Sequence, residues 1–221
     1  MERQLIPYKY IAIEGNIGAG KSTLTNFLAD HFRAIRLMEE FEENESLKDF
    51  YANPDFALQA ELQFLLDRNR QLHSFHKKDH PLIIADYIPQ KSLLFAKLNL
   101  SPKDFKLYSP MAHNLLSSFP QPDLIIYLKR STDELVHNIA KRGREYEEQI
   151  DRSYLDRLNK VYQTDLVKLS NCPILEIEAK DINLRKPEEL RAAFNRILQK
   201  QYASQVRQIN LATMLNFDPL S

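Results

Sequence analysis

A run of small and polar residues near the amino terminus has the composition and spacing of a phosphate-binding loop. It reads Gly15-Asn16-Ile17-Gly18-Ala19-Gly20-Lys21-Ser22 and fits the pattern G-x-x-x-x-G-K-[ST]. Glycines let backbone N–H groups surround phosphate oxygens, and the positive end of a following helix favours the anion. Three of the chain's four glycines lie here. The sequence therefore predicts that this loop, with Thr23 after it, binds the phosphates of ATP or another nucleoside triphosphate.

Three side chains could complete the chemistry of phosphoryl transfer around the loop. Lys21 would reach the β- and γ-phosphates, and the Ser22 hydroxyl would bind Mg²⁺. Asp86 closes an apolar run at 81–85 and has the form of the acid that holds a nucleotide's Mg²⁺. A simple strand-end aspartate is the alternative interpretation of Asp86.

Two charged clusters each allow two interpretations. Residues 39–43 read E-E-F-E-E, which is either a solvated acidic face or the source of one functional carboxylate. Because ligands bind at the carboxyl ends of parallel strands, a glutamate directly after a strand favours the second. Residues 141–144 read K-R-G-R and are either a solvated helix end or a mobile lid that brings Arg142 and Arg144 over the triphosphate.

The elements that position these residues follow from hydrophobic periodicity. Apolar runs predict strands at 9–14, 34–38, 81–86, 124–128 and 173–177. Helical spacing and capping residues predict helices at 20–31, 54–76, 90–98, 101–118, 131–141, 151–170 and 187–201. This alternation predicts an α/β fold, an open parallel five-stranded sheet with helices on both faces, of the P-loop kinase type. We predict one domain over 1–203 and assign no role to the tail at 204–221.

Composition limits the classes of partner. Thirty Lys and Arg residues balance thirty Asp and Glu residues, so no basic field predicts binding to nucleic acid. No apolar run approaches the length of a membrane span, and residues 1–4 do not resemble a signal peptide. The single cysteine, Cys172, excludes an intramolecular disulfide and favours the cytoplasm.

Six short segments, in the order in which they occur along the chain, carry a recognisable pattern. They are I-A-I-E-G-N-I-G-A-G-K-S, E-E-F-E-E-N-x-x-L-x-x-F-Y, L-Q-A-E-L-Q-F-L-L-D-R, A-D-Y-x-x-x-K-S-L-x-F-A, P-D-L-I-I-Y-L and K-R-G-R-E-Y-E. As an ordered set they resemble the deoxynucleoside kinases, especially the bacterial deoxyadenosine/deoxyguanosine branch, over about residues 8–180. The resemblance implies transfer of a phosphoryl group from ATP or another NTP to a deoxynucleoside 5′-hydroxyl. It also implies a homodimer formed through the long helices.

The resemblance implies a role for each acceptor-side residue. Glu39 looks like the carboxylate that takes the proton from the 5′-hydroxyl, and Glu40 ranks second. Gln59, beside the leucine stripe of the long helix, is similar to the glutamine that binds the base edge. Tyr51 and Glu147 look like the pair that holds the ribose 3′-hydroxyl.

Around the transferred phosphate, the resemblance identifies Arg142 and Arg144 with the lid arginines and Asp86 with the acid at the end of strand 3. One residue departs from the pattern. Many members follow that acid with an arginine that contacts the 5′ oxygen, and here Tyr87 follows it. The residues do not indicate which base is preferred, because a glutamine amide offers both a donor and an acceptor.

Three alternative functions share parts of this pattern. A nucleoside monophosphate kinase of the thymidylate type would need a cation for its acceptor phosphate, and the uncharged stretch 87–90 argues against it. A regulatory GTPase would need an N-K-x-D motif, which the sequence lacks. A nucleotide-binding module without catalysis stays open, because the expected arginine is missing at position 87.

Overall fold

The computed structural model describes residues 6–39, 46, 50, 53–76, 81–147 and 149–215. The strands in these ranges are β1 (Tyr10–Gly15), β2 (Ile35–Leu37), β3 (Ile83–Ala85), β4 (Leu124–Lys129), β5 (Ile174–Glu178) and β6 (Val206–Ile209). The helices are α1 (Lys21–Phe32), α3 (Ala57–His76), α4 (Lys91–Asn99), α5 (Pro102–Leu116), α6 (Thr132–Arg142), α7 (Arg152–Leu169), α8 (Pro187–Leu198) and α9 (Leu211–Leu215). Short 3-10 turns are η1 (Pro54–Phe56), η2 (Glu145–Glu147) and η3 (Ala179–Asp181).

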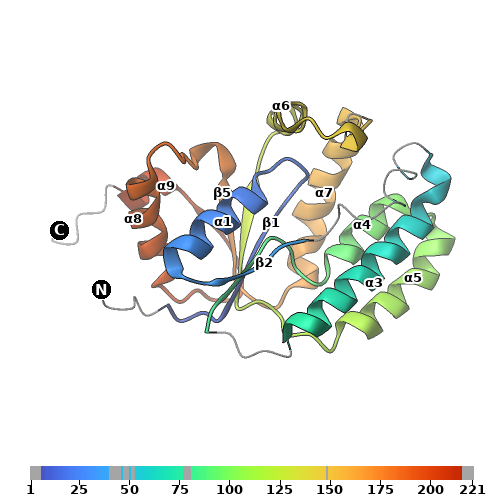
Figure 1. Cartoon of the computed structure of the whole chain (residues 1–221), viewed down its shortest axis with the longest axis horizontal. Coiled ribbons are helices and arrows are strands. Elements are labelled where there is room, and N and C mark those ends of the chain that lie inside the picture. Colours follow the sequence, from blue (N-terminus) through green and yellow to red (C-terminus); the bar gives the residue numbers. More distant parts are fainter. Residues whose placement is uncertain are drawn as a thin grey trace.

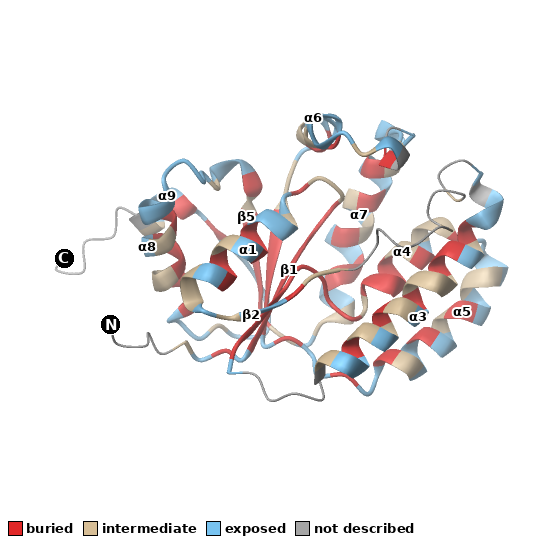
Figure 2. Cartoon of the chain, viewed as in Figure 1, coloured by how far each residue is buried: buried red, intermediate tan, exposed pale blue. Residues whose placement is uncertain are grey.

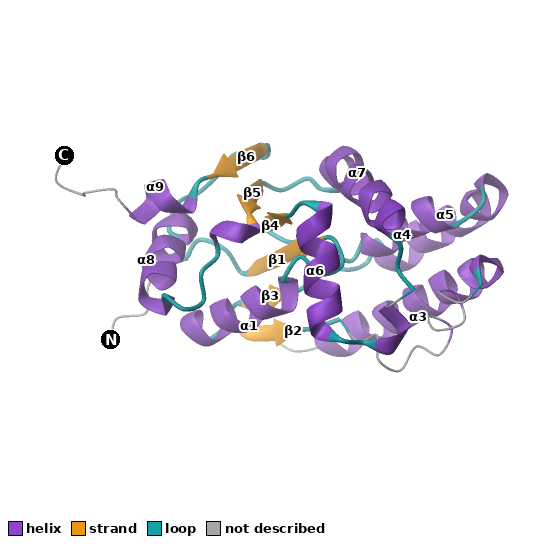
Figure 3. Ribbon diagram, turned by 90° about the horizontal axis from the view of Figure 1, so that it is seen from above, coloured by secondary structure: helices purple, strands orange, loops and turns teal. Residues whose placement is uncertain are grey.

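The strands form one parallel sheet in the order β2-β3-β1-β4-β5-β6. Helices α1, α8 and α9 lie on one side of it, and α3, α4, α5 and α7 lie on the other (Figures 1 and 3). The predicted α/β architecture with helices on both faces is therefore confirmed.

The central strands are largely buried (Figure 2). Side-chain alternation along them builds a core on each face of the sheet. In β1, Ile11 and Ile13 join the cluster packed against α1 and α8, whereas Tyr10 and Ala12 join the one packed against α3, α4 and α7. Successive residues of a strand point to opposite faces, and both faces are covered. This explains why β1 is buried along its whole length.

The sheet has a sixth strand, which corrects the predicted number of five. β6 lies in the tail at 204–221 and pairs in parallel with β5, with Ile177 beside Ile209. Its sequence, Val-Arg-Gln-Ile, buries only Ile209. An edge strand with one buried residue has no apolar run, so hydrophobic periodicity does not reveal it.

Side-chain caps fix the starts of several helices as the sequence predicts. Ser131 and Glu134 form a reciprocal capping box at α6, and Ser101 accepts a hydrogen bond from the Asp104 N–H at α5. Within the described ranges, no helix combines the length and the apolarity needed to cross a lipid bilayer.

Candidate active site

The loop between β1 and α1 contacts two helices, α6 and α7. The Asn16 amide donates to the Leu155 carbonyl and to Asn159 Oδ1 of α7 at 2.9 and 2.8 Å. The Asn138 amide of α6 donates to the Gly18 carbonyl at 2.8 Å. A Cβ atom on Gly18 would lie 3.0 Å from the Leu135 carbonyl oxygen, so glycine permits this close approach of α6. These contacts fix the position of the loop between α6 and α7.

Lys21 at the start of α1 turns back onto this loop. Its ammonium donates to the carbonyls of Gly15 and Asn16 at 2.9 and 3.0 Å. Burial and the nearby Lys91 ammonium lower the pKa of Lys21 to about 8, although Glu14 favours the charged form. A phosphate would replace the carbonyls as the partner of this cation.

Asp86, directly after β3, connects the start of α1 to Glu39. Its Oδ2 accepts a hydrogen bond from Ser22 Oγ at 2.7 Å, and its Oδ1 accepts from the Glu39 N–H at 2.7 Å. A hydroxyl beside a carboxylate is a hard-oxygen donor set that suits Mg²⁺. Among the described residues, no three His, Cys, Asp or Glu side chains form a metal site by themselves.

Glu39, just after β2, forms the centre of a buried charge cluster. It accepts from the Arg68 guanidinium of α3 through one oxygen and from the Lys91 ammonium of α4 through the other. Burial alone would raise the pKa of Glu39, but Lys91 and Arg68 outweigh it and lower the pKa to about 2. The Glu39 carboxyl is therefore ionised near neutral pH and accepts hydrogen bonds.

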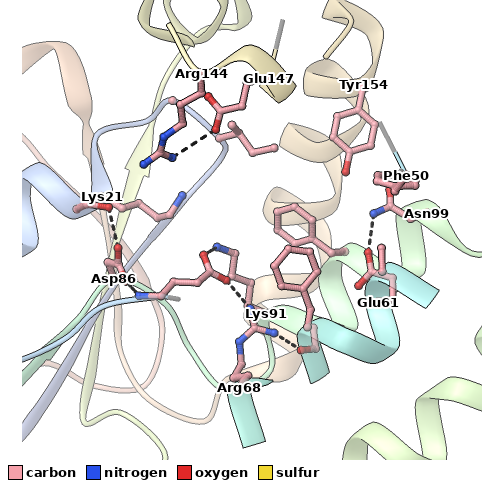
Figure 4. A pocket seen from close by; sticks show the side chains of 18 of the residues that line it. Lys21, Phe50, Glu61, Arg68, Asp86, Lys91, Asn99, Arg144, Glu147 and Tyr154 are labelled. Atoms are coloured by element: carbon pink, nitrogen blue, oxygen red, sulfur yellow. Dashed lines mark hydrogen bonds and ion pairs between the residues drawn. The ribbon is translucent and has the colours of Figure 1, made fainter. Parts of the chain in front are cut away.

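These groups line one cavity of about 870 Å³, counted with its open mouth. Figure 4 shows Lys21 and Asp86 on one side of it and Glu61, Asn99 and Tyr154 on the other, with Arg68 and Lys91 between. Phe50, Phe64 and Phe95 also line it. The lining residues suit a small molecule that places a polar end at the loop and a planar end among the aromatic rings.

Above the cavity, two arginines contact one buried carboxylate. Arg142 at the end of α6 and Arg144 both pair with Glu147, which is 5% exposed. Gly143 separates the arginines with a positive φ of 67°, a conformation that glycine adopts without strain. The predicted lid residues and Glu147 therefore lie together at the same cavity.

The structure brings together most of the residues that the sequence singles out, but not all of them. Lys21, Ser22, Glu39, Asp86, Arg142, Arg144 and Glu147 line the cavity. Tyr51 and Glu40 lie outside the described residues. Gln59 is exposed and does not line the cavity, whereas Glu61, two residues later, is buried and does.

Sequence reasoning misses the residues supplied by α3 and α4. Arg68 and Lys91 are 6% exposed, and both contact the carboxylate that should meet the acceptor. The buried stripe of α3 contains two charged residues at helical spacing with leucines: Glu61, Leu65, Arg68 and Leu72. Charged residues at positions of the apolar stripe were therefore the sequence signal that could have identified them.

Lys91 and Arg68 also supply positive charge near Tyr87, the residue that stands where the family resemblance leads us to expect an arginine. The Tyr87 side chain is fully buried, donates its hydroxyl to Gln71 of α3, and lies under the Arg68 guanidinium at 5.2 Å from the ring centroid. The positive charge beside Glu39 thus comes from two helices instead of from the residue after Asp86.

Comparison with known proteins gives consistent results. The profile of the family described as deoxynucleoside kinase matches residues 11–201. A deoxyguanosine kinase of Bacillus subtilis is 38% identical over 195 residues, covering 83% of this chain and 94% of the relative. A deoxyadenosine/deoxycytidine kinase of the same organism is 28% identical over 186 residues, covering 80% and 86%. A structure of deoxyadenosine kinase from M. mycoides, with dCMP and dCDP bound as products, superposes with a TM-score of 0.73 at 26% identity and covers 85% and 98%.

Proposed function

The chain belongs to the deoxynucleoside kinase family, and on that premise we propose how it transfers the terminal phosphoryl group of ATP to a deoxynucleoside 5′-hydroxyl. It is an enzyme, and its predicted resemblance to this family is confirmed. The observation that carries the mechanism is that Gly18, Lys21 and Ser22 of the loop line the same cavity as Glu39. The products would be a nucleoside diphosphate and a deoxynucleoside 5′-monophosphate.

In this mechanism Glu39 accepts the proton of the 5′-hydroxyl as that oxygen bonds to the γ-phosphorus and the bond to the β–γ bridging oxygen breaks. Phosphoryl transfer depends mainly on positioning and on neutralising charge. Lys21 would exchange its loop carbonyls for the β- and γ-phosphates, and residues 15–23 would surround them. Arg68 and Lys91 fix both oxygens of Glu39, and Lys91 takes the place of the arginine that Tyr87 replaces, beside the 5′ oxygen.

Mg²⁺ fits the pair formed by Ser22 and Asp86, whose oxygens are 2.7 Å apart. When bound there it would neutralise charge on the phosphates. Asp86 also accepts from the Glu39 N–H, so the same carboxylate would help to hold the ion and positions the backbone of the proposed base.

An ADP-release assay with a panel of deoxynucleosides and deoxynucleoside monophosphates tests this function. We expect turnover with deoxynucleosides alone. Turnover with monophosphates would instead favour a nucleoside monophosphate kinase, for which Arg68 and Lys91 are poorly suited because both already pair with Glu39. Nucleotide binding without any turnover would indicate a module that lacks catalysis.

We expect Arg142→Ala and Arg144→Ala each to lower kcat by ~10³-fold with a smaller effect on the KM for deoxynucleoside. The reason is that a lid arginine neutralises charge that develops only during transfer. Steady-state kinetics at saturating ATP measure both parameters, and Lys141→Ala is the matched control because Lys141 is an exposed neighbour. If both arginine variants keep a near-native kcat, residues 141–144 are a solvated helix end and not a catalytic lid.

We also propose a homodimer formed through the long helices. Three large apolar side chains on the neighbouring helices α3 and α5 support it: Leu66, Leu107 and Met111 are 50%, 68% and 40% exposed. The single cysteine favours a reducing compartment, so we further propose a cytoplasmic location.

Leu107→Glu should convert the dimer to a monomer, because a charge on that surface would be buried without a partner. Light scattering after size-exclusion chromatography measures the mass. Leu184→Glu, which changes another exposed leucine (43%), should leave the dimer intact. A monomeric wild-type protein would contradict the proposal.

A further inference from the structure

One buried carboxylate in the cavity has a hydrogen-bond partner at only one of its two oxygens within the described residues. Glu61 of α3 is 3% exposed, and its Oε1 accepts from the Asn99 amide of α4 at 2.6 Å. Its Oε2 is buried and has no hydrogen-bond partner within the described part of the chain. Leaving such an acceptor unsatisfied is costly, so this oxygen indicates a binding partner that is not part of the protein.

The surroundings of Glu61 indicate what kind of group that partner is. Glu61, Asn99 and Tyr154 lie across the cavity from Lys21 and Asp86 (Figure 4). Phe64 and Phe95 line the same cavity, so the chamber next to Glu61 suits a flat ring with polar atoms on its edge. If the phosphates and the 5′-hydroxyl lie at the loop, the nucleobase lies here.

The chemistry of a carboxylate distinguishes between the bases. An ionised carboxylate only accepts hydrogen bonds. Guanine presents two adjacent donors on its Watson–Crick edge, the N1–H and the exocyclic amino group. Adenine and cytosine present one amino donor beside a ring nitrogen that accepts, and this acceptor would face the carboxylate unfavourably. Thymine presents a single N–H between two carbonyl oxygens.

We propose that Glu61 selects the base of the acceptor and that its buried carboxylate favours deoxyguanosine by accepting hydrogen bonds from guanine N1–H and N2–H. This inference rests on the proposed deoxynucleoside kinase activity. Asn99 holds Oε1, which fixes the orientation of the carboxylate. Glu61 thereby takes the role that the sequence resemblance implies for Gln59, whose side chain is exposed.

The protonation of Glu61 gives the selection a pH dependence. Burial raises the pKa of Glu61 to about 7, although the Asn99 hydrogen bond opposes this shift. The other titratable groups that act on it are Arg68 on the same helix, Lys91 on α4, Glu39 after β2, Tyr108 on α5 and Tyr154 on α7. Below pH 7 the carboxyl is protonated and offers a donor and an acceptor, as adenine requires. Above pH 7 it is ionised, as guanine requires.

Glu61→Gln is the decisive variant because an amide keeps the shape of the side chain and offers one donor and one acceptor. We expect its kcat/KM for deoxyguanosine relative to deoxyadenosine to fall by about 100-fold or more, since a polar group rejects a mismatched edge strongly. Asp67→Asn is the matched control: it makes the same chemical change on the same helix, where Asp67 pairs with Gln63 and Arg70. Its ratio should stay at the wild-type value.

Two measurements on the wild-type enzyme keep the test independent of how well the variant folds. The ratio of kcat/KM for deoxyguanosine over deoxyadenosine should be higher at pH 8 than at pH 6. Deoxyinosine, which lacks the N2 amino group, should have a kcat/KM about 10-fold or more below that of deoxyguanosine.

The possible failures of this inference and of the proposed function are distinguishable. A wild-type enzyme that phosphorylates deoxynucleosides with the same base ratio before and after Glu61→Gln would overturn the role of Glu61. A changed ratio in Gln59→Ala instead would return base selection to Gln59. A wild-type protein that phosphorylates no deoxynucleoside, yet binds ATP, would overturn the proposed function itself.

Discussion

Replacing Glu39 with glutamine should lower kcat by about 10²–10⁴-fold, because the 5′-hydroxyl would lose the base that accepts its proton. The amide preserves the size and polarity of the side chain, and ATP contacts the loop instead of this residue, so the Kd for ATP should barely change. Steady-state kinetics and direct titration with ATP measure the two effects separately. The low pKa of Glu39, about 2, further predicts that its protonation does not reduce kcat between pH 5 and pH 8.

A stability effect must be separated from this catalytic effect, since Glu39→Gln leaves Arg68 and Lys91 buried without their counter-charge. Asp165→Asn is the matched control. Asp165 is 6% exposed and pairs with Lys97 and Lys168, but it does not line the cavity. It should lower Tm and leave kcat unchanged. If Glu39→Gln stays within a few-fold of wild-type kcat while Glu40→Gln is inactive, the base is the neighbouring residue.

Lys21→Ala should abolish phosphoryl transfer, with a loss in kcat of about 10³-fold or more, because its charge would act on the β- and γ-phosphates during transfer. The fold should remain intact. Within the described residues, Lys21 donates hydrogen bonds only to two carbonyls of its own loop, and water can replace it there. We therefore expect Tm to change by no more than about 2 °C, as measured by thermal unfolding.

Lys103→Ala controls for the loss of a lysine at an exposed site of α5 and should retain full activity. A Tm that falls by many degrees in Lys21→Ala, together with lost activity, would make Lys21 a structural residue. Retained activity with an intact fold would remove it from the mechanism.

The loop between β1 and α1 could be predicted from the sequence because its residues are consecutive and follow a fixed spacing. The position of Asp86 followed from a different rule, that a buried parallel strand is continuously apolar and ends at the ligand-binding edge. Local patterns of this kind need no knowledge of how distant segments pack.

The acceptor side of the site could not be predicted in the same way, because it depends on the rotation of α3 about its own axis. Leucines gave the predicted face of this helix, yet Leu66 is 50% exposed while Glu61 and Arg68 are buried. A prediction that assigns the buried face of a helix from its apolar residues places charged residues on the outer face. At this site they lie on the inner face because Arg68 pairs with Glu39, Asn99 donates to Glu61 and both charged side chains line the cavity. The partners of these residues belong to other segments of the chain.

Lys91 illustrates the same limitation. Nothing near position 91 in the sequence connects it with Glu39, and the contact arises because the start of α4 packs beside the end of β2. The absence of an arginine at Tyr87 therefore says little about activity until the helices that pack over it are known.

The contact between α6 and the phosphate loop also has a consequence for the entropy of lid closure. Asn138 joins the middle of α6 to Gly18. If Arg142 and Arg144 close over a bound triphosphate as we propose, α6 is docked beforehand and the segment that begins at Gly143 would reorganise. Ordering each backbone residue costs about 1–2 kcal/mol. A hinge this close to the arginines keeps the number of newly ordered residues small, and more of the binding energy of the nucleotide stays available for the reacting phosphate.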